Sequence, residues 1–260
     1  MFEKLFSMEG KVCVITGGSR GLGAFMAKGF LQAGAKRVFI TARKAEACIA
    51  TAEELSQYGE CIALPGDISV ADELKTLVET LSSQESCVDV LVNNAGSSWG
   101  GMLGAFPEKG WDKIMDLNVK SPFFLTQAML PLLKNQATAE NTASVINIGS
   151  VAGLIGDSLN AYSYGPSKAA LHQLTRNLAK DLADDHIRVN AIAPGRFVSK
   201  MTEYVTQDQT AYEAECKEIP LHRFGNETDI AGVAIMLASQ AGEFITGQVI
   251  PVDGGATLVS

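Results

Sequence analysis

Basic charge and long apolar runs are both scarce in this sequence. Its 21 lysines and arginines are outnumbered by 29 aspartates and glutamates, which gives a formal net charge of -8. A chain of this balance has no basic surface for nucleic acid or anionic lipid. No apolar run reaches the roughly 18 residues of a membrane span, and residues 1–10 lack the apolar core of a signal peptide. We expect no nucleic-acid partner and no membrane partner.

Cysteine and histidine are too dispersed for a disulfide framework or a metal site. The five cysteines are odd in number, none has a C-x-x-C spacing, and the three histidines stand far apart. These residues are Cys13, Cys48, Cys61, Cys87, Cys216, His172, His186 and His222. We predict reduced thiols, no metal and a cytoplasmic location.

What the chain does contain is short apolar segments in regular alternation. Of its 260 residues 47% are hydrophobic and 19% are charged, which suits one domain over residues 1–260 with a sizeable core. The expected strands are 11–16, 37–41, 61–64, 88–92, 144–148, 188–193 and 249–252, and the expected helices are 24–32, 45–58, 71–81, 111–133, 161–183 and 228–238. This alternation predicts an α/β fold, a single-domain Rossmann-type doubly wound parallel sheet of seven strands with helices on both faces.

A glycine-rich turn follows the first expected strand. The residues Thr16-Gly17-Gly18-Ser19-Arg20-Gly21-Leu22-Gly23 stand between a β-branched run and a helical pattern. Glycine tolerates positive φ and lets a ligand approach the backbone, and the start of a helix offers free N–H groups to a pyrophosphate. A tight turn without a ligand is the alternative, because the spacing is TGxxxGxG rather than GxGxxG. The strand and the helix on either side favour phosphate binding.

The second expected strand ends without an acidic residue. A dinucleotide fold that selects NAD usually places a carboxylate there for the ribose hydroxyls, but this strand leads into Ala42-Arg43-Lys44. Arg43 and Arg20 can pair instead with the 2′-phosphate of NADP, because a guanidinium recognises a phosphate through paired hydrogen bonds. The alternative is that both are solvated surface arginines. The missing carboxylate and the two cations together favour NADP over NAD.

A tyrosine and a lysine stand four residues apart at the head of an apolar helical pattern. Tyr164 and Lys168 therefore project from one side of the expected helix. A free phenol titrates near ~10, and a neighbouring cation favours the phenolate. The pair is suited to exchange a proton near neutral pH, although the spacing alone also arises by chance.

Polar residues gather where the expected strands end. Asp67, residues 93–96 and Gly149-Ser150 each follow a strand, and parallel strands open their ligand crevice at their carboxyl ends. Asn93 could simply satisfy a strand end, but its place near a glycine favours a site role. Residues 196–222 also follow a strand and are either a substrate lid or a surface helical excursion.

With these pieces in order, the chain resembles the short-chain dehydrogenase/reductases over essentially its whole length. The motifs that carry the resemblance are the glycine turn at 16–23, Asp67, Asn93-Asn94-Ala95-Gly96, Leu117-Asn118-Val119, Ser150, Tyr164 with Lys168, Pro194-Gly195 and Asp253-Gly254-Gly255. Their order along the chain is the family's order. The resemblance implies a nicotinamide-dependent oxidoreductase.

Carried over position by position, the resemblance implies four catalytic residues. Tyr164 is the proton donor, Ser150 holds the substrate carbonyl oxygen, and Lys168 binds the nicotinamide ribose and lowers the pKa of the phenol. Asn118 holds a water that links Lys168 to solvent. Ser199 stands where the family more often has a threonine. The expected cofactor contacts, which include the glycine turn and the cations, are Gly17, Ser19, Arg20, Gly21, Leu22, Gly23, Arg43, Lys44, Asp67, Ile68, Asn94, Ala95, Gly96, Tyr164, Lys168, Pro194, Gly195, Phe197 and Ser199.

Among the subfamilies, the chain looks most like the NADPH-dependent β-ketoacyl reductases, and within these like the ones named for rhamnolipid synthesis. This implies reduction of a ketone to a secondary alcohol on a β-ketoacyl thioester or a related 3-oxo substrate. Asp184-Asp185 stand where reductases of fatty-acid synthesis usually carry an arginine that docks the acidic acyl carrier protein, so that partner is doubtful. The alternatives are a broad-specificity carbonyl reductase or alcohol dehydrogenase on free ketones, and a non-catalytic NADP-binding sensor.

The two longest expected helices predict an oligomer. Residues 111–133 and 161–183 carry an apolar surface wider than the ~100° stripe of a helix with one exposed side. In the second helix this surface consists of Ala169, Ala170, Leu171, Leu174, Leu178, Ala179 and Leu182. The resemblance implies a two-fold interface on these helices and a second one at the C-terminal strand and tail. We expect a homotetramer, with a dimer as the fallback.

Overall fold

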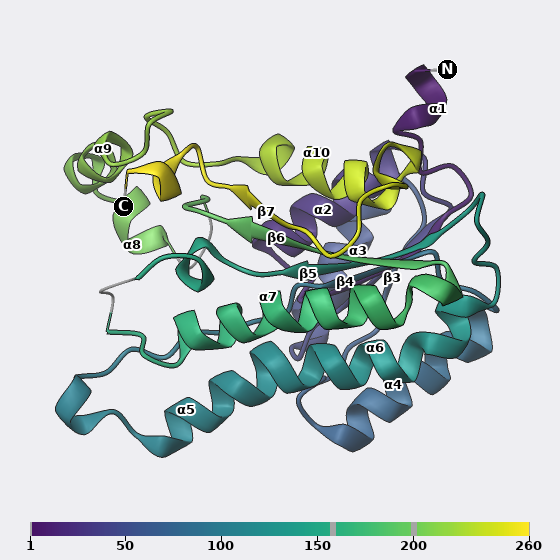
Figure 1. Cartoon of the computed structure of the whole chain (residues 1–260), viewed down its shortest axis with the longest axis horizontal. Coiled ribbons are helices and arrows are strands. Elements are labelled where there is room, and N and C mark those ends of the chain that lie inside the picture. Colours follow the sequence, from purple (N-terminus) through teal and green to yellow (C-terminus); the bar gives the residue numbers. More distant parts are fainter. Residues whose placement is uncertain (1, 157–159, 199–201, 260) are drawn as a thin grey trace.

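The computed structural model describes residues 2–156, 160–198 and 202–259, and a sheet of seven parallel strands lies at its centre (Figure 1). The strands are β1 Val12–Thr16, β2 Arg37–Thr41, β3 Cys61–Ala63, β4 Val90–Asn93, β5 Ala143–Ile148, β6 Ile187–Pro194 and β7 Val249–Val252. Their order across the sheet is β3-β2-β1-β4-β5-β6-β7. The predicted α/β class and parallel seven-stranded sheet are confirmed.

Helices cover both faces of this sheet, as predicted. One face carries α2 Gly21–Gln32, α3 Ala45–Leu55 and α10 Glu227–Ala238, and the other carries α4 Ala71–Gln84, α6 Ser121–Lys134 and α7 Tyr164–Asp181 (Figure 1). The shorter helices are α1 Phe2–Leu5, α5 Glu108–Met115, α8 Glu203–Thr206 and α9 Gln209–Lys217. In the part of the chain that the structure describes, no helix is both long enough and apolar enough to cross a bilayer.

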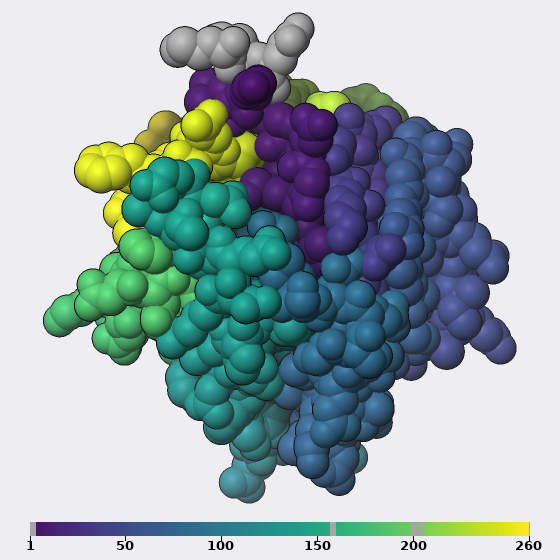
Figure 2. Space-filling model, turned by 90° about the vertical axis from the view of Figure 1, so that its right-hand side faces the viewer, coloured from purple at the N-terminus to yellow at the C-terminus, as the bar shows by residue number. Residues whose placement is uncertain are grey.

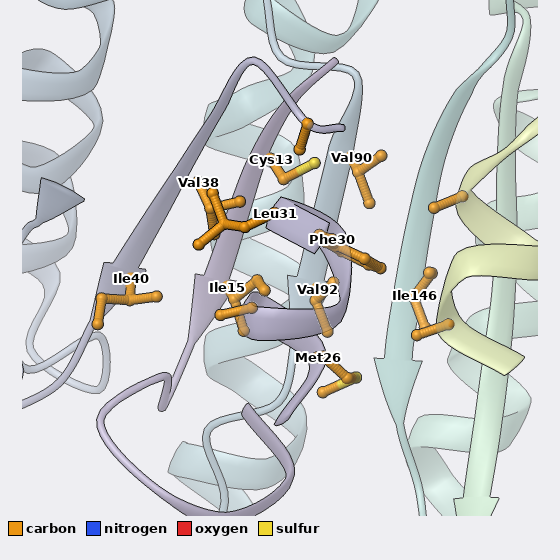
Figure 3. Close-up of a cluster of buried hydrophobic side chains, with 14 of the residues drawn as sticks. Cys13, Ile15, Met26, Phe30, Leu31, Val38, Ile40, Val90, Val92 and Ile146 are labelled. Atoms are coloured by element: carbon orange, nitrogen blue, oxygen red, sulfur yellow. The ribbon is translucent and has the colours of Figure 1, made fainter. Parts of the chain in front are cut away.

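The core explains why the sequences of the strands are continuous apolar runs. Every residue of β1 is buried, because a parallel sheet is covered on both faces and its strands need apolar side chains on both. On one face, Met26 and Phe30 of α2 pack against side chains of β1, β2 and β4 that include Ile15 (Figure 3). This packing fixes α2 directly after the glycine turn.

The strand order creates the crevice in which a ligand is expected. The chain proceeds from β1 to β2 on one side, whereas β4 returns to pair with β1 on the other side. The helices that follow β1 and β4 therefore lie on opposite faces, and the carboxyl ends of these two strands border an open space. These ends point to the left in Figure 1, toward α8 and α9.

The opposite end of the molecule is closed by contacts between distant segments. Figure 2 shows this end, where the purple N-terminal segment lies beside the teal segment that follows α6. The Lys11 ammonium donates to Asn141 Oδ1 at 3.3 Å, and the backbone N–H of Val12 donates to Asp89 Oδ2 at 2.8 Å. A ligand site is therefore expected at the other end, where the carboxyl ends of the strands lie.

Two predicted helices differ from the observed ones in a way that matters for the site. The expected helix 111–133 begins at Glu108 and is interrupted by a π-helical turn, Asp116–Lys120, between α5 and α6. The expected helix 161–183 begins only at Tyr164. The residues before it form a turn in which the N–H of Tyr164 donates to the carbonyl of Ala161 at 2.8 Å. A π-turn inserts one residue into a helix that otherwise continues, and a shift this short was not resolved by the apolar periodicity of the sequence. The other boundaries shift by a few residues, as with α2, which begins at Gly21, and α3, which ends at Leu55.

Candidate functional site

A pocket of about 520 Å³ lies at the carboxyl ends of β1, β2, β4, β5 and β6. It gathers seventeen of the predicted site residues from positions 17 to 197. They are Gly17, Ser19, Arg20, Gly21, Leu22, Arg43, Lys44, Asp67, Ile68, Asn94, Ala95, Gly96, Tyr164, Lys168, Pro194, Gly195 and Phe197. Its size and its polar groups suit a small-molecule ligand.

Three predicted residues lie behind this lining, and one cannot be placed. Gly23 packs α2 onto the turn, because a Cβ there would lie 2.4 Å from the carbonyl oxygen of Gly17. Ser150 and Asn118 are buried next to the pocket, with exposed fractions of 8% and 0%. Ser199 lies outside the described residues.

Asn93 does not have the site role that we predicted from its sequence position. Its side chain is buried, and Nδ2 donates to Asn147 Oδ1 at 2.9 Å and to Thr126 Oγ1 at 3.1 Å. Asn147 in turn donates to Thr175 Oγ1 at 2.9 Å. Asn93 therefore joins β4 to β5 and α6 through a buried polar network, and the pocket is lined by Asn94 instead.

The glycine turn has the geometry of a phosphate cradle. Gly17 and Gly21 adopt φ values of +66° and +53°, which only glycine reaches without strain. Thr16 Oγ1 accepts hydrogen bonds from the N–H groups of Asn94 and Ala95, both at 2.9 Å, and so ties the turn to the segment after β4. No side chain caps the start of α2, which leaves its first N–H groups available to an anion.

Cationic side chains occupy one rim of the pocket. Arg20, Arg43 and Lys44 all line it, and the Arg43 side chain is 58% exposed. Arg43 Nη1 lies 4.0 Å from Asp67 Oδ2, at the limit of an ion pair. This pair is exposed enough to be weak, so the guanidinium is available to a phosphate.

Tyr164 and Lys168 share one face of α7 at the base of the pocket, as predicted. Lys168 Nζ lies 5.7 Å from the centroid of the Tyr164 ring and donates to the carbonyl oxygen of Ile148 at 2.7 Å. Burial lowers the pKa of the Lys168 ammonium to about 8, because the charged form loses its hydration. A positive charge is therefore held close to the phenol in a poorly hydrated space.

The π-turn directs Asn118 toward the same place. Its Oδ1 accepts from the N–H of Ser97 at 3.0 Å, and its Nδ2 donates to the carbonyl of Ser97 at 2.9 Å and to Ser167 Oγ at 3.0 Å. A Cβ on Gly96 would lie 3.3 Å from Asn118 Oδ1 and 3.4 Å from Lys168 Nζ. Both polar atoms therefore face the same side of Gly96, where the absence of a side chain leaves room.

Nine lining residues were not among the predicted site residues. They are Thr16, Thr41, Ala42, Ala47, Gly66, Leu117, Ile148, Gly149 and Thr202. Six of them carry a signal in the sequence, because five end a strand or directly follow one, and Gly66 directly precedes Asp67. Ala47, Leu117 and Thr202 carry no such signal, because tertiary packing brings them to the pocket. Within the described residues, no cluster of His, Cys, Asp and Glu side chains is placed to hold a metal ion.

Lys168→Met is expected to change how stability depends on pH. The ammonium has a pKa of about 8 in the folded chain, against its ordinary value of 10.5. Between these values the unfolded chain binds more protons, so this group makes the wild-type free energy of unfolding rise with pH. The difference between wild type and variant is expected to be flat below pH 8 and to rise by up to ~1.4 kcal/mol per pH unit above it. Urea unfolding of the cofactor-free protein at pH 7, 8, 9 and 10 measures this difference.

The control is Lys75→Met on α4, where the side chain is 74% exposed. This change removes the same charge from a hydrated position, so it is expected to show no rise between pH 8 and 10. If the difference between wild type and Lys168→Met stayed flat between pH 8 and 10, Lys168 would keep its ordinary pKa.

Comparisons with known proteins agree with this geometry. The family described as "Enoyl-(Acyl carrier protein) reductase" matches residues 17–257. The chain is 53% identical over 250 residues to the rhamnolipids biosynthesis 3-oxoacyl-[acyl-carrier-protein] reductase of Pseudomonas aeruginosa, covering 96% of this chain and 97% of the relative. It is 35% identical over 253 residues to the 3-oxoacyl-[acyl-carrier-protein] reductase FabG of Thermotoga maritima, covering 96% of this chain and 99% of that one.

A solved structure supports the same relationship. The Pseudomonas aeruginosa RhlG/NADP active-site complex superposes with a TM-score of 0.95 at 52% identity, covering 97% of this chain and 98% of the other. A match of this extent includes the sheet, the glycine turn and the helix that carries Tyr164 and Lys168. This chain belongs to the short-chain dehydrogenase/reductase family.

Proposed function

We propose that this chain is an NADPH-dependent ketoreductase that converts a ketone to a secondary alcohol, with a β-ketoacyl thioester or a related 3-oxo compound as substrate. The observation that carries the proposal is the placement of Tyr164 and Lys168 on one face of α7 inside a pocket with a phosphate cradle. The relatives named 3-oxoacyl-[acyl-carrier-protein] reductase support the substrate class.

The residues of the pocket fit NADPH. The glycine turn and the uncapped start of α2 suit the pyrophosphate, and Arg20, Arg43 and Lys44 suit the 2′-phosphate. Asp67, Ile68 and residues 94–96 form the side assigned to the adenosine, and Lys168 is assigned to the nicotinamide ribose. When bound, NADPH supplies the hydride that reduces the carbonyl carbon.

The protein's own groups handle the charge that develops on the carbonyl oxygen. In this proposal the Tyr164 hydroxyl donates its proton to that oxygen, and the Ser150 hydroxyl donates a hydrogen bond to it. The Lys168 ammonium stabilises the phenolate that Tyr164 becomes, and Asn118 holds the water through which Lys168 exchanges protons with solvent. General acid catalysis and preorganised donors of this kind each contribute on the order of 10²- to 10⁴-fold in rate.

The surroundings of the pocket favour a substrate with an apolar part. The loop that follows Gly96 exposes Met102 and Leu103 by 72% and 73%, and the N–H of Gly101 donates to the carbonyl of Asn160, close to the start of α7, at 2.9 Å. On another side, α8 and α9 belong to the described part of the segment 196–222, and Thr202 of this segment lines the pocket. We propose that this segment is the substrate lid.

The end of α7 gives no support for docking of an acyl carrier protein. Asp184 and Asp185 form a short turn there, and Asp185 Oδ2 pairs with Lys134 Nζ at 2.7 Å. An acidic carrier would meet carboxylates at this place, and like charges repel it. We propose that a thioester substrate is recognised through its acyl part.

Substrate preference tests the proposed function. NADPH oxidation is measured with a β-ketoacyl thioester and, separately, with an unactivated ketone of the same carbon number. We expect a kcat/KM at least ~10-fold higher for the thioester, since binding energy from the remote part of a substrate raises reactivity. Equal values would favour the broad carbonyl reductase, and NADPH binding without turnover of any ketone would favour the sensor.

We also propose that the enzyme is a homotetramer, with a dimer as the fallback, because α7 keeps apolar surface that the chain itself does not cover. Leu174 and Leu178 on α7 are only partly buried, and Ala169 is exposed. Leu178→Glu places a charge on this surface and is expected to lower both the oligomer size and the activity, since α7 also carries Tyr164 and Lys168. Light scattering and NADPH oxidation measure the two effects. An active wild-type monomer at micromolar concentration would contradict the proposal.

The five cysteines support a proposed cytoplasmic location. All of them are free thiols in the structure, and four of the five are buried. Reduced thiols of this kind are typical of cytosolic proteins.

A further inference from the structure

His172 is a buried histidine that the proposed reaction does not use. It follows Lys168 by one turn on α7, and its side chain is 2% exposed. Burial lowers the pKa of the imidazole to about 4, and the positive charge of Lys168 acts in the same direction. The ring is therefore neutral over the usual working range of pH.

The ring lies against Gly149 and Gly153, the two glycines at the ends of the turn that carries Ser150. A Cβ on Gly149 would lie 2.1 Å from His172 Nε2, and a Cβ on Gly153 would lie 2.8 Å from His172 Cε1. The Cβ on Gly153 would also lie 2.7 Å from the backbone of both Lys168 and Ala169. The turn 149–153 therefore rests directly on the His172 ring and on the backbone of α7, with no space for a side chain between them.

The turn also holds the Ser150 hydroxyl from within. The N–H of Ala152 donates to Ser150 Oγ at 3.2 Å, and the N–H of Gly153 donates to the Ser150 carbonyl at 3.0 Å. The N–H of Gly149 donates to the carbonyl of Ile192 on β6 at 2.7 Å. The bond to Ile192 ties Gly149 to β6, whereas the position of Gly153 relative to α7 depends on packing against the helix and the His172 ring.

We propose that His172 is a positioning residue for Ser150. Its ring fills the space between α7 and the turn 149–153, and so sets the distance between the Ser150 hydroxyl and the Tyr164 hydroxyl, which act on one oxygen. A smaller side chain would leave a gap beside Gly149 and Gly153, where the ring now lies, and the turn would shift into that gap. The inference rests on the proposed function, because it assigns Ser150 to the substrate oxygen.

A double-mutant cycle with Ser150→Ala tests this proposal. His172→Ala is expected to lower kcat about tenfold, since a displacement of ~1 Å in a reacting geometry can cost up to 10²-fold, while the Kd for NADPH stays within about twofold. In the Ser150→Ala background the same change is expected to cost less than about twofold, because the group that it positions is already absent. Equal losses of kcat in both backgrounds would overturn the proposal.

Two further variants at position 172 distinguish the effect of side-chain length on kcat from a failure to fold. His172→Gln keeps a planar polar end at nearly the reach of Nε2 and is expected to retain kcat within about threefold, whereas His172→Asn is one methylene shorter and is expected to behave like His172→Ala. If His172→Ala does not fold, His172→Asn takes its place in the cycle. A pH profile of kcat that shifts in these variants would show that the ring acts through Lys168 instead, and would also overturn the proposal.

Leu171→Ala is the matched control. Leu171 neighbours His172 on α7 and is equally buried, with an exposed fraction of 1%. Its truncation is expected to lower the urea midpoint of unfolding, because a buried side chain is lost, and to lower kcat in the folded enzyme less than about twofold. A tenfold loss of kcat in Leu171→Ala would make the effect at position 172 general to the helix, against the proposal.

Hydrogen exchange gives a readout that does not depend on activity. In His172→Ala the amides of Ala152 and Gly153, which bond within the turn, are expected to exchange at least ~10-fold faster than in wild type or in Leu171→Ala. Unchanged exchange would overturn the positioning role. A wild-type enzyme that reduces no ketone would overturn the proposed function instead, and the exchange result would stand separately.

Discussion

Tyr164→Phe is expected to lower the turnover of ketone reduction by at least ~10²-fold while NADPH binding stays nearly unchanged. The substitution removes only the hydroxyl, so the aromatic ring still lines the pocket and still lies 5.7 Å from Lys168 Nζ. After hydride transfer to the carbonyl carbon, the substrate oxygen then has no positioned acid and must take its proton from water. Steady-state NADPH oxidation gives kcat, and quenching of protein fluorescence gives the Kd for NADPH.

Tyr162→Phe is the control for this experiment. Tyr162 lies two residues before Tyr164, is 37% exposed, and donates from its hydroxyl to Asn160 Oδ1 at 3.3 Å. It does not line the pocket, so the loss of its hydroxyl is expected to leave kcat within about twofold. Retained turnover in Tyr164→Phe would remove the residue from the proposed mechanism.

Arg43→Asp is expected to shift the cofactor preference from NADPH toward NADH. Charge-assisted hydrogen bonds are worth ~1.5 to 3 kcal/mol, so losing those to the 2′-phosphate corresponds to roughly a 10- to 100-fold fall in the NADPH to NADH ratio of kcat/KM. The new carboxylate repels the phosphate and also faces Asp67, whose Oδ2 lies 4.0 Å from the Arg43 guanidinium in the wild type. Combining the change with Arg20→Ala is expected to extend the shift, because Arg20 lines the same rim.

Lys75→Asp makes the same change in net charge on α4, outside the pocket lining. It is expected to leave the ratio of kcat/KM nearly unchanged, since the Lys75 side chain is 74% exposed, pairs with Glu79 and is not part of the pocket lining, and salt weakens interactions between exposed charges. An unchanged ratio in Arg43→Asp would mean that Arg43 is a solvated surface residue, and the selectivity would then have to come from Arg20 or Lys44.

Tyr164→Phe and Arg43→Asp both depend on features that the local sequence predicts well. A spacing of four residues places two side chains on one helical face whatever the tertiary structure, so Tyr164 and Lys168 meet as expected. The end of β2 was also predictable, because its β-branched run stops before Ala42. Arg43, which comes next, therefore lies at the carboxyl end of the strand.

The positions behind the pocket were less predictable. The role of Asn93 was wrong because its partners, Thr126 and Asn147, lie 33 and 54 residues away in sequence. The π-turn that carries Asn118 was missed because it adds one residue to an otherwise unbroken helical pattern. Thr202 reaches the pocket only through the path of the segment after β6.

The α/β class, the seven strands, the glycine turn and the pairing of Tyr164 with Lys168 were therefore predictable, because each follows from residues close together in the chain. Three other features came from packing between distant segments: Asn93 supports the sheet, Gly23 packs α2 onto the turn, and the His172 ring lies under the turn of Ser150. These contacts join segments whose separation depends on how helices and strands pack to within about an ångström. Side-chain volume and packing distance set that fit, and no local pattern of residues encodes either.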